Sequence, residues 1–406
     1  MQELLWMSPH APYDQVRHAG GKSHNYYIKY FQKTGRYQIT LLSLCQRDEE
    51  AFLDLDSYGI VNRIFCVNKS RKQRIWKKIV NAPSCLNPFD RYAGGCLAYE
   101  RQALLRALRQ YKEEGHHPSL VVLQWTFVLL LWKQVRKLFP KARMIAIEED
   151  VTFLGYERKW KSASNSAKRF FWKIRYRRMK QIELEGLAQS ALIVLNNPKD
   201  QELLLRNHIP KEKTFVSLPY FERYDHLERR PDGKTLLFYG AMYRPENYRS
   251  VAWMAEEVMP LLDENIQLVV VGGNPDKSLQ KWEGRRIHIT GFVENVEPYL
   301  QSCLCMAAPL VLGAGIKVKV LEAMSAGIPV LTNRIGIEGI AAENGKEFFL
   351  CETPQEYAET VRKLMRDERL TRMVGEAARS YIRENSDLPD RLEKLSAAME
   401  KLAANA

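Results

Sequence analysis

The chain has 406 residues, of which 46% are hydrophobic and 27% charged, and its formal net charge at pH 7 is +13. This composition excludes an intrinsically disordered chain, and the length exceeds what one hydrophobic core usually serves, so we expect two domains. The basic excess is compatible with nucleic acid, an anionic membrane surface or an acidic substrate as partner, and does not choose among them.

Short apolar runs alternate with helical patterns along the whole chain. In the first half we predict strands at 3–7, 37–44, 60–67, 119–125, 143–149 and 191–195. In the second half we predict strands at 235–240, 266–273, 286–292, 303–311 and 328–332, and helices from about residue 354 to the end. This alternation indicates an α/β fold with parallel, doubly wound sheets.

The polar segment 221–234, which contains Pro-Asp-Gly, predicts a linker between two domains. We place the first domain at 1–225 and the second at 226–385, and we expect a last helix at about 386–406 to pack back on the first domain. Two such domains would enclose a cleft, and doubly wound sheets bind ligands outside the carboxyl ends of their strands. The loops that follow strands are therefore the candidates for chemistry.

The sequence also bears on location and redox state. The seven cysteines form no Cys-x-x-Cys pair, so we expect buried thiols in a reducing cytoplasm rather than disulfides or a zinc site. The first residues, MQELLWMSPH, lack a basic region and a long apolar core, so we expect no signal peptide. The longest apolar run, 120–132, is too short for a membrane span and predicts a buried strand that leads into a helix.

The stretch GAGIKVKVLEAMSAGIPVLTN, residues 313–333, places a small-residue turn before a predicted helix at 317–326. Free N–H groups and the helix dipole at such a helix start favour an anion, and Lys317 and Lys319 add positive charge. Helical side chains tilt toward the N-terminus, so the Glu322 carboxylate can lean back toward the loop. This combination suits a ligand that carries both phosphate and hydroxyl groups.

Other loops after strands add weaker signals. Gly20 and Gly21 allow a backbone to approach a phosphate, although an ordinary flexible loop explains them equally well. Arg244 could bind a phosphate, and Asn247 could cap the helix that follows it. None of the glycine-containing loops has the GxGxxG spacing, which disfavours a dinucleotide oxidoreductase.

Polar or aromatic groups end several further strands. Gly291 with Phe292 could read a nucleobase edge. Gln124 and the acidic residues 148–150, among them Asp150, could contact substrate or could be solvated loop groups. Asp54-Leu55-Asp56 has a spacing seen in metal-dependent sugar transferases of another fold, but the histidines are few and dispersed, and we predict no metal site.

The segment 158–180 carries ten basic residues and no acidic residue, with Phe170, Phe171, Trp172 and Tyr176 interleaved among them. Three interpretations remain open, namely a helix on an anionic membrane surface, a nucleic-acid contact, and a solvated helix whose aromatic residues face the core. The charge allows contact with the inner face of a membrane, and we expect no nucleic acid as partner.

Residues 235–340 resemble the GT-B glycosyltransferases of family 4, the "group 1" retaining enzymes. The resemblance is carried, in order and spacing, by LLFYGAMYRPENYRSVAWMAEEVMP, LVVVGGNP, HITGFVENVEPYLQSC and APLVLGAGIKVKVLEAMSAGIPVLTNRIGIEGI, with the subtype pattern GxGIKxKxLEA. It implies a GT-B fold of two Rossmann-like domains, with a nucleoside-diphosphate sugar held by the second and the acceptor by the first.

The resemblance also implies site residues. Glu322 would bind the ribose hydroxyls of the donor, and Gly20 and Gly21 would close over its phosphates. The other donor-binding residues would be Gly313, Ala314, Gly315, Ile316, Gly240, Asn247, Gly291 and Phe292. Gln124 and Asp150 would lie on the acceptor side, and Lys317, Lys319 and Arg244 would stabilise the leaving diphosphate without a metal.

Four positions depart from the family pattern. The first of its paired glutamates is Ala314 here, its arginine and lysine after the first strand of the second domain are Ala241 and Glu246, and its histidine at the end of a strand is Gln124. Arg244, Lys317 and Lys319 could supply the missing positive charge. Gln124 can donate a hydrogen bond to a sugar hydroxyl but cannot become cationic.

We therefore predict a retaining, metal-independent hexosyltransferase without a cofactor, located in the cytoplasm or peripherally at the inner membrane face. Its donor would be a nucleoside-diphosphate sugar, with a UDP-sugar favoured, and its acceptor a glycan or lipid-linked sugar in cell-surface polysaccharide assembly. Two alternatives remain, a nucleotide-sugar epimerase and a non-catalytic module that binds a membrane or polyanion.

Overall fold

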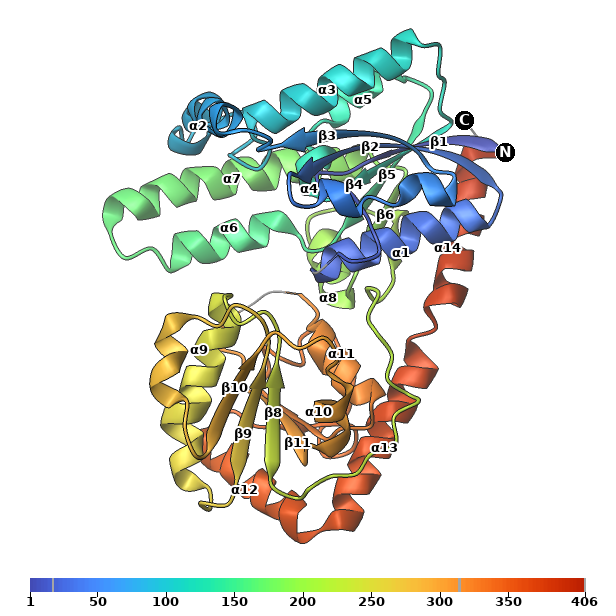
Figure 1. The fold of residues 1–406 in the computed structure, drawn as a ribbon. Coiled ribbons are helices and arrows are strands. Elements are labelled where there is room, and N and C mark those ends of the chain that lie inside the picture. Colours follow the sequence, from blue (N-terminus) through green and yellow to red (C-terminus); the bar gives the residue numbers. More distant parts are fainter. Residues whose placement is uncertain (17, 313–314, 405–406) are drawn as a thin grey trace. The chain divides into compact units, whose positions relative to one another are not determined.

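The computed structural model describes residues 1–16, 18–312 and 315–404. The chain forms two compact units, one of Met1–Tyr220 with Leu388–Ala406 and one of Phe221–Asp387 (Figure 1). The boundary predicted from the sequence is at residue 225. We call these unit 1 and unit 2. Within the described ranges, no helix has both the length and the apolar character that crossing a membrane requires.

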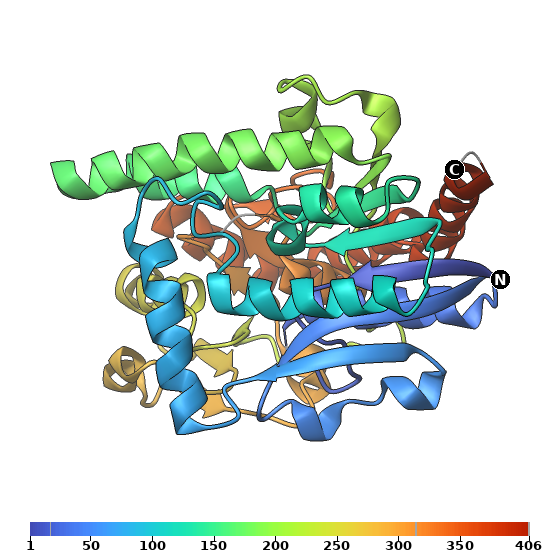
Figure 2. The same cartoon turned by 90° about the horizontal axis from the view of Figure 1, so that it is seen from above.

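Unit 1 is built on a parallel sheet with strand order β3-β2-β1-β4-β5-β6-β7 (Figures 1 and 2). Its strands are β1 (Gln2–Met7), β2 (Tyr37–Gln46), β3 (Val61–Val67), β4 (Leu120–Gln124), β5 (Arg143–Glu148), β6 (Leu192–Leu195) and β7 (Thr214–Val216). Its helices are α1 (Ala19–Lys33), α2 (Arg71–Leu86), α3 (Ala98–Glu113), α4 (Thr126–Leu129), α5 (Trp132–Leu138), α6 (Thr152–Lys161), α7 (Ser166–Gln189), α8 (Pro198–Leu205) and α14 (Leu388–Ala404).

Both faces of this sheet are buried. Leu4 and Trp6 of β1 belong to one hydrophobic cluster, Leu5 and Met7 belong to another, and none of the four side chains is exposed. Successive residues of a strand point to opposite faces, so the continuous apolar run ELLWM is what a strand covered on both sides requires.

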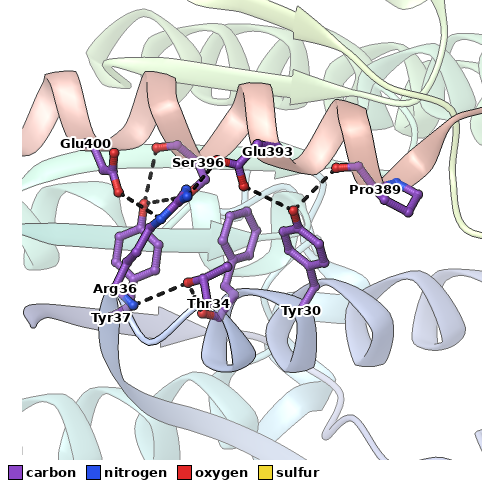
Figure 3. Close-up of polar contacts among 9 residues, drawn as sticks. Tyr30, Thr34, Arg36, Tyr37, Pro389, Glu393, Ser396 and Glu400 are labelled. Atoms are coloured by element: carbon purple, nitrogen blue, oxygen red, sulfur yellow. Dashed lines mark hydrogen bonds and ion pairs between the residues drawn. The ribbon is translucent and has the colours of Figure 1, made fainter.

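The C-terminal helix α14 completes unit 1. Its Leu392, Leu395 and Met399 are buried in the same cluster as Phe31 of α1. Polar contacts flank this packing (Figure 3). The Tyr37 hydroxyl lies 3.1 Å from the Ser396 hydroxyl. Further along the same helix, the Glu393 carboxylate accepts hydrogen bonds from the Tyr30 hydroxyl and the Arg36 guanidinium. The chain therefore leaves unit 1 after residue 220 and returns to it at residue 388.

Unit 2 has a second parallel sheet with strand order β10-β9-β8-β11-β12-β13. Its strands are β8 (Thr235–Tyr239), β9 (Gln267–Val271), β10 (Ile287–Gly291), β11 (Cys305–Ala308), β12 (Val330–Thr332) and β13 (Phe349–Leu350). Its helices are α9 (Pro245–Trp253), α10 (Glu297–Ser302), α11 (Val318–Ser325), α12 (Pro354–Arg366) and α13 (Glu368–Asn385). Both sheets confirm the predicted α/β class.

Each strand predicted from the sequence is present, but two strands were missed. These are β7, all of whose residues are partly exposed, and the two-residue β13; each lies at an edge of its sheet. Short, half-exposed edge strands carry little of the continuous apolar pattern that identified the central ones.

Candidate active site

The strand order of unit 2 reverses between β8 and β11, which are paired although they are not consecutive. The described segments that follow these two strands are Gly240 to Arg244, and Pro309 to Leu312 with Gly315 to Lys317. Ligands of open α/β sheets bind at such a reversal, outside the carboxyl ends of the strands. Helix α11 begins directly after the second loop.

The start and end of α11 agree with the pattern that predicted it. Lys317 is the N-cap residue, and Gly327 follows the helix with φ of +72°. The N–H groups of Gly327 and Ile328 bind the carbonyl oxygens of Met324 and Ala323, which satisfies two free carbonyls at the helix end. The helix is thereby held with its N-terminus at the strand ends.

Lys319 reaches from α11 to α9, the helix after β8, in which Asn247 is an internal residue and Arg244 the N-cap. Its Nζ donates a hydrogen bond of 2.5 Å to Oδ1 of Asn247 and lies 4.6 Å from the centre of the Phe238 ring. A Cβ atom at Gly240 would lie 2.9 Å from this Nζ, so a side chain there would displace the ammonium group. Burial lowers the pKa of Lys319 to about 7, although Glu246 and Glu322 act in the opposite direction.

Glu322, one turn further along α11, is a buried carboxylate with 9% exposure. The Tyr239 hydroxyl lies 3.1 Å from its Oε2 and 2.9 Å from the carbonyl oxygen of Lys319, and shares its proton between these acceptors. Burial, followed by the charge of Glu322, raises the pKa of Tyr239 well above its usual value, so the phenol stays a donor. The site therefore combines a buried cation and an oriented carboxylate on one helix.

The remaining predicted cations are placed differently. The Nζ of Lys317 donates to the carbonyl oxygen of Gly315, 2.5 Å away, and lies 3.9 Å from Oε2 of Glu338. Arg244 is largely exposed and lies 3.7 Å from the Glu246 carboxylate. Lys317 is therefore held against the loop that precedes α11, whereas Arg244 extends into solvent. Gly313 and Ala314 lie outside the described residues.

Close backbone packing shapes the rest of this edge. A Cβ atom at Gly272, at the end of β9, would lie 1.7 Å from the carbonyl oxygen of Gly240. Gly291, at the end of β10, has φ of +72°, and Phe292 beside it is 70% exposed. Ile316 precedes α11 and packs partly buried against the core of the unit. An exposed aromatic ring beside the strand ends is available to stack on a planar group.

Unit 1 has a cavity of about 530 Å³ at the carboxyl ends of its own strands. Residues at or just after the ends of β1, β2, β3, β4 and β5 line this cavity, among them His10, Trp125, Glu149 and Asp150, and Lys77 of α2 also lines it. The residues predicted from the sequence on the acceptor side are Asp150 and Gln124. Asp150 lines the cavity, whereas Gln124 is fully buried behind it.

Gln124 acts on the cavity through Glu149. Its Nε2 donates to Oε1 of Glu149 over 3.1 Å, and Nδ2 of Asn196 donates to Oε2 of the same carboxylate over 2.6 Å. Burial raises the pKa of Glu149 to about 7, against the lowering effect of these two hydrogen bonds. A carboxyl group that titrates near neutral pH and lines a cavity is a candidate functional group.

Gly20 and Gly21, predicted in a loop before a helix, lie instead in the first turn of α1, beside this carboxylate. A Cβ atom at Gly20 would lie 3.2 Å from the Trp125 ring and 3.5 Å from the Glu149 carboxyl carbon, so the start of the helix packs closely there. The N–H of Gly21 donates to Nδ1 of His18, which caps α1. Trp125 has φ of +68°, an uncommon conformation for a bulky residue that marks a position worth testing for function.

Sequence reasoning missed Tyr239, Trp125 and the role of Glu149. Tyr239 is a hydrophobic strand residue by pattern, and only the fold brings its hydroxyl to Glu322.

The Asp54 carboxylate, part of the Asp-Leu-Asp spacing, binds Lys29 at 2.9 Å instead of facing a strand end. Across the described ranges, no group of three or more acidic, histidine or cysteine side chains has the arrangement of a metal site.

Comparison with known proteins finds a family match for one part of the chain and similar folds for the whole of it. Residues 233–367, a third of the chain, match the family described as "Glycosyl transferases group 1". An uncharacterized 44.6 kDa protein in the cps region of Klebsiella pneumoniae is 23% identical over 221 residues. That alignment covers 50% of this chain and spans about half, 54%, of the curated relative.

Three solved structures illustrate the likeness in fold. Sucrose-phosphate synthase from Thermosynechococcus elongatus has a TM-score of 0.72 at 13% identity, with both chains fully covered. HepE from Anabaena, solved with UDP, has a TM-score of 0.66 at 12% identity, with 99% of this chain and 100% of that chain covered. WaaG, a glycosyltransferase involved in lipopolysaccharide biosynthesis, has a TM-score of 0.61 at 15% identity, with 97% and 98% covered. The predicted fold, GT-B with two Rossmann-like domains, is confirmed.

Proposed function

We propose that this protein is a retaining glycosyltransferase of family 4 that moves a hexose from a nucleoside-diphosphate sugar to a glycan or lipid-linked acceptor in cell-surface polysaccharide assembly. The observation that carries the proposal is the pairing on α11 of Lys319, bound to Asn247, with Glu322, bound to Tyr239. A cation suits a diphosphate and a carboxylate suits a vicinal diol, and both occur in a nucleoside diphosphate.

The donor would lie along the strand ends of unit 2. Glu322 would accept hydrogen bonds from the ribose hydroxyls, and Phe292 with Gly291 would contact the base. Gly315 and Ile316 would face the sugar and diphosphate, as would Gly313 and Ala314, which lie outside the described residues, and Gly240 would leave room for the phosphates. HepE, a structural relative, was solved with UDP-glucose, so a UDP-sugar is the first donor to test.

The chemistry would depend on charge that develops on the leaving diphosphate. As the bond from the anomeric carbon to the diphosphate breaks, negative charge builds on the leaving oxygen. Lys317, Lys319 and Arg244 would stabilise that charge together with the N–H groups at the start of α11, so no metal would be needed. With retention, the leaving phosphate would accept the proton of the acceptor hydroxyl.

The acceptor would bind in the cavity of unit 1. Asp150 and Glu149 would accept hydrogen bonds from sugar hydroxyls, and Gln124 would hold Glu149 in place. Gly20 and Gly21 would close over the donor phosphates. We place the enzyme in the cytoplasm and at the inner face of a membrane, with the basic segment 158–180 attracted to anionic lipid.

Thermal unfolding with nucleotides tests the proposal. UDP, GDP and ADP are added separately to the wild type and to Glu322→Ala. A ligand at 100 times its Kd adds about 2.7 kcal/mol to the free energy of unfolding. We expect one nucleotide to raise the Tm of the wild type and to raise that of the variant much less. No shift with any of the three would remove the main support for a donor site.

One alternative has a specific observation in its favour. The first glutamate of the family pair is replaced by Ala314, which favours a module that no longer transfers sugar. Hydrolysis of UDP-sugars without an acceptor separates the two cases, because a transferase releases UDP slowly and a decayed site releases none. Loss of that turnover in Lys319→Ala would tie it to the proposed site.

A further inference from the structure

Helix α2 packs with its polar face toward the protein. Nδ2 of Asn81 donates to Glu100 over 3.1 Å, Nε2 of Gln73 donates to the Tyr99 hydroxyl over 2.8 Å, and Nζ of Lys77 lies 2.6 Å from the Glu100 carboxylate. Apart from Asn81, only Ser84 of this helix is buried. An ordinary surface helix shows the reverse arrangement, with its apolar face buried.

The apolar residues of α2 face solvent as a consequence. Ile75, Trp76 and Ile79 are 52%, 60% and 58% exposed, and Leu86 is 76% exposed. Phe89, in the turn directly after the helix, is 66% exposed. We call these five residues the α2 surface. Ile75, Ile79 and Leu86 are spaced by four and seven residues, which places them on one side of the helix.

Clustered apolar side chains of this size on a helix indicate a partner that covers them, and the surrounding charge indicates which partner. Between Arg71 and Leu86 the helix has no acidic residue, and four basic side chains on it are exposed. These are Arg71, Lys72, Arg74 and Lys78. Apolar residues flanked by lysine and arginine are the pattern of a helix that lies in the headgroup region of an anionic membrane.

The α2 surface continues into the basic hairpin formed by α6 and α7. Arg175 of α7 donates to the carbonyl oxygens of Cys85 and Asn87 at the end of α2, over 2.8 and 3.2 Å. In two views α2 and the far end of the hairpin lie on the same side of unit 1 (Figures 1 and 2).

The aromatic residues of the hairpin are mostly used within it. The rings of Tyr156 and Trp172 are 5.7 Å apart, and those of Trp160 and Tyr176 stack at 5.5 Å. Phe170 alone among the large hydrophobic residues of 158–180 is strongly exposed, at 64%. This segment therefore offers positive charge, and the apolar contact comes from α2.

We propose that the α2 surface inserts into an anionic lipid membrane, with the basic residues of α2 contacting the headgroups. The opposite face of α2 contributes Lys77 to the cavity of unit 1, so the membrane would adjoin that cavity. This arrangement would bring a lipid-linked acceptor to the proposed acceptor site. The membrane contact itself does not depend on sugar transfer.

Vesicle binding tests the inference with the full chain. Cys85 is the one exposed cysteine of the seven, all of which the structure describes, so it can carry an environment-sensitive fluorophore at the end of α2. Vesicles are made of phosphatidylcholine alone or of equal parts phosphatidylcholine and phosphatidylglycerol. We expect a blue shift and co-sedimentation with the anionic vesicles, weakened by raising the salt concentration.

Two variants of α2 separate its apolar and charged contributions. Trp76→Ser with Ile79→Ser, and Lys72→Glu with Lys78→Glu, should each lower partitioning on unlabelled protein by at least about tenfold. Met373→Ser, which removes a 57% exposed side chain from α13 in unit 2, is the matched control and should change nothing. The thermal response to a nucleotide should be kept in all of these variants, so failure here is distinct from failure of the proposed function.

Three results would overturn the inference. Equal binding to neutral vesicles would show that charge does not select the surface. Binding that is unchanged in both α2 variants would assign membrane contact to another part of the chain. Self-association that disappears in Trp76→Ser with Ile79→Ser, without any vesicle binding, would identify a second copy of the chain as the occupant.

Discussion

The ammonium group of Lys319 on α11 donates a hydrogen bond to the side-chain oxygen of Asn247 on α9, across 72 positions of the sequence. Burial lowers the pKa of this lysine to about 7 when no ligand is bound. A bound diphosphate would favour the charged form and raise the pKa again. Nucleotide binding should therefore be coupled to proton uptake.

We predict that UDP affinity falls as the pH rises above 7. At pH 8 only about one-tenth of a group with a pKa near 7 is protonated, so the apparent Kd should be about tenfold higher than the intrinsic value. Calorimetry in two buffers of different ionisation enthalpy should detect uptake of nearly one proton at pH 8.

Lys319→Arg is the control, because arginine stays charged throughout this range. Its Kd should vary little between pH 7 and 8. An equal pH dependence in the variant would assign the effect to another group.

Glu322 and Lys319 should bind different parts of a nucleotide, namely the ribose and the diphosphate. Glu322→Ala removes acceptors for the ribose and should weaken UDP binding by about 10- to 100-fold, because hydrogen bonds to a charged group contribute about 1.5–3 kcal/mol. Pyrophosphate, which has no ribose, should bind this variant as it binds the wild type. Lys319→Ala should weaken both ligands. Competition with a fluorescent nucleotide measures the affinity of UDP and of pyrophosphate for the wild type and for both variants. An equal loss of pyrophosphate affinity in Glu322→Ala would contradict the assignment.

Gly272→Ala should destabilise unit 2 by several kcal/mol. The new Cβ would overlap the carbonyl oxygen of Gly240, 1.7 Å away, at a φ of +155° that side chains rarely adopt. Gly284→Ala is the matched control, since its Cβ would meet no atom within 4 Å and its cost should stay below about 1 kcal/mol. Denaturant unfolding of the two variants compares these costs, and equal stability would show that the two strand ends can separate freely.

The last helix should stabilise unit 1 through its apolar residues rather than its ion pairs. Leu395→Ala removes a fully buried side chain from the core shared with α1 and should cost about 2–5 kcal/mol. Glu393→Gln removes the negative charge from the 2.6 Å contact with Arg36, but both side chains are more than one-third exposed, so we expect a much smaller loss of stability than for Leu395→Ala. Hydrogen exchange followed by mass spectrometry should show faster exchange in unit 1 for Leu395→Ala and no change in unit 2. Faster exchange confined to α14 would mean that the helix is not part of the core.

Glu149 should make unit 1 less stable as the pH rises from about 4.5 to 7. Its pKa is raised in the folded state, so between pH 4.5 and 7 the folded protein binds more protons than the unfolded chain. The free energy of unfolding therefore falls as the pH rises through this window. Glu149→Gln removes this titration. The difference in unfolding free energy between variant and wild type should therefore shift in favour of the variant as the pH rises, and a constant difference from pH 4.5 to 7 would contradict the cause.

The sequence by itself determined the parts of the site that are contiguous along the chain. The turn, Lys317, Lys319 and Glu322 lie within one loop and one short helix, so helix periodicity and helix-end chemistry were enough to bring them together. The central strands could also be predicted from the sequence, because a strand buried on both faces is a continuous apolar run.

The tertiary structure decided which groups from distant segments meet. Tyr239 reaches Glu322, and Gln124 and Asn196 hold Glu149, only because parallel strands bring their carboxyl ends to one edge of a sheet. Helix α2 is the strongest case. A surface helix ordinarily buries its apolar face, but Tyr99 and Glu100 of α3 bind the polar face of α2 instead, and the apolar residues are left in solvent. Periodicity identifies the faces of a helix, whereas the hydrogen-bonding partners on neighbouring elements select the face that is buried.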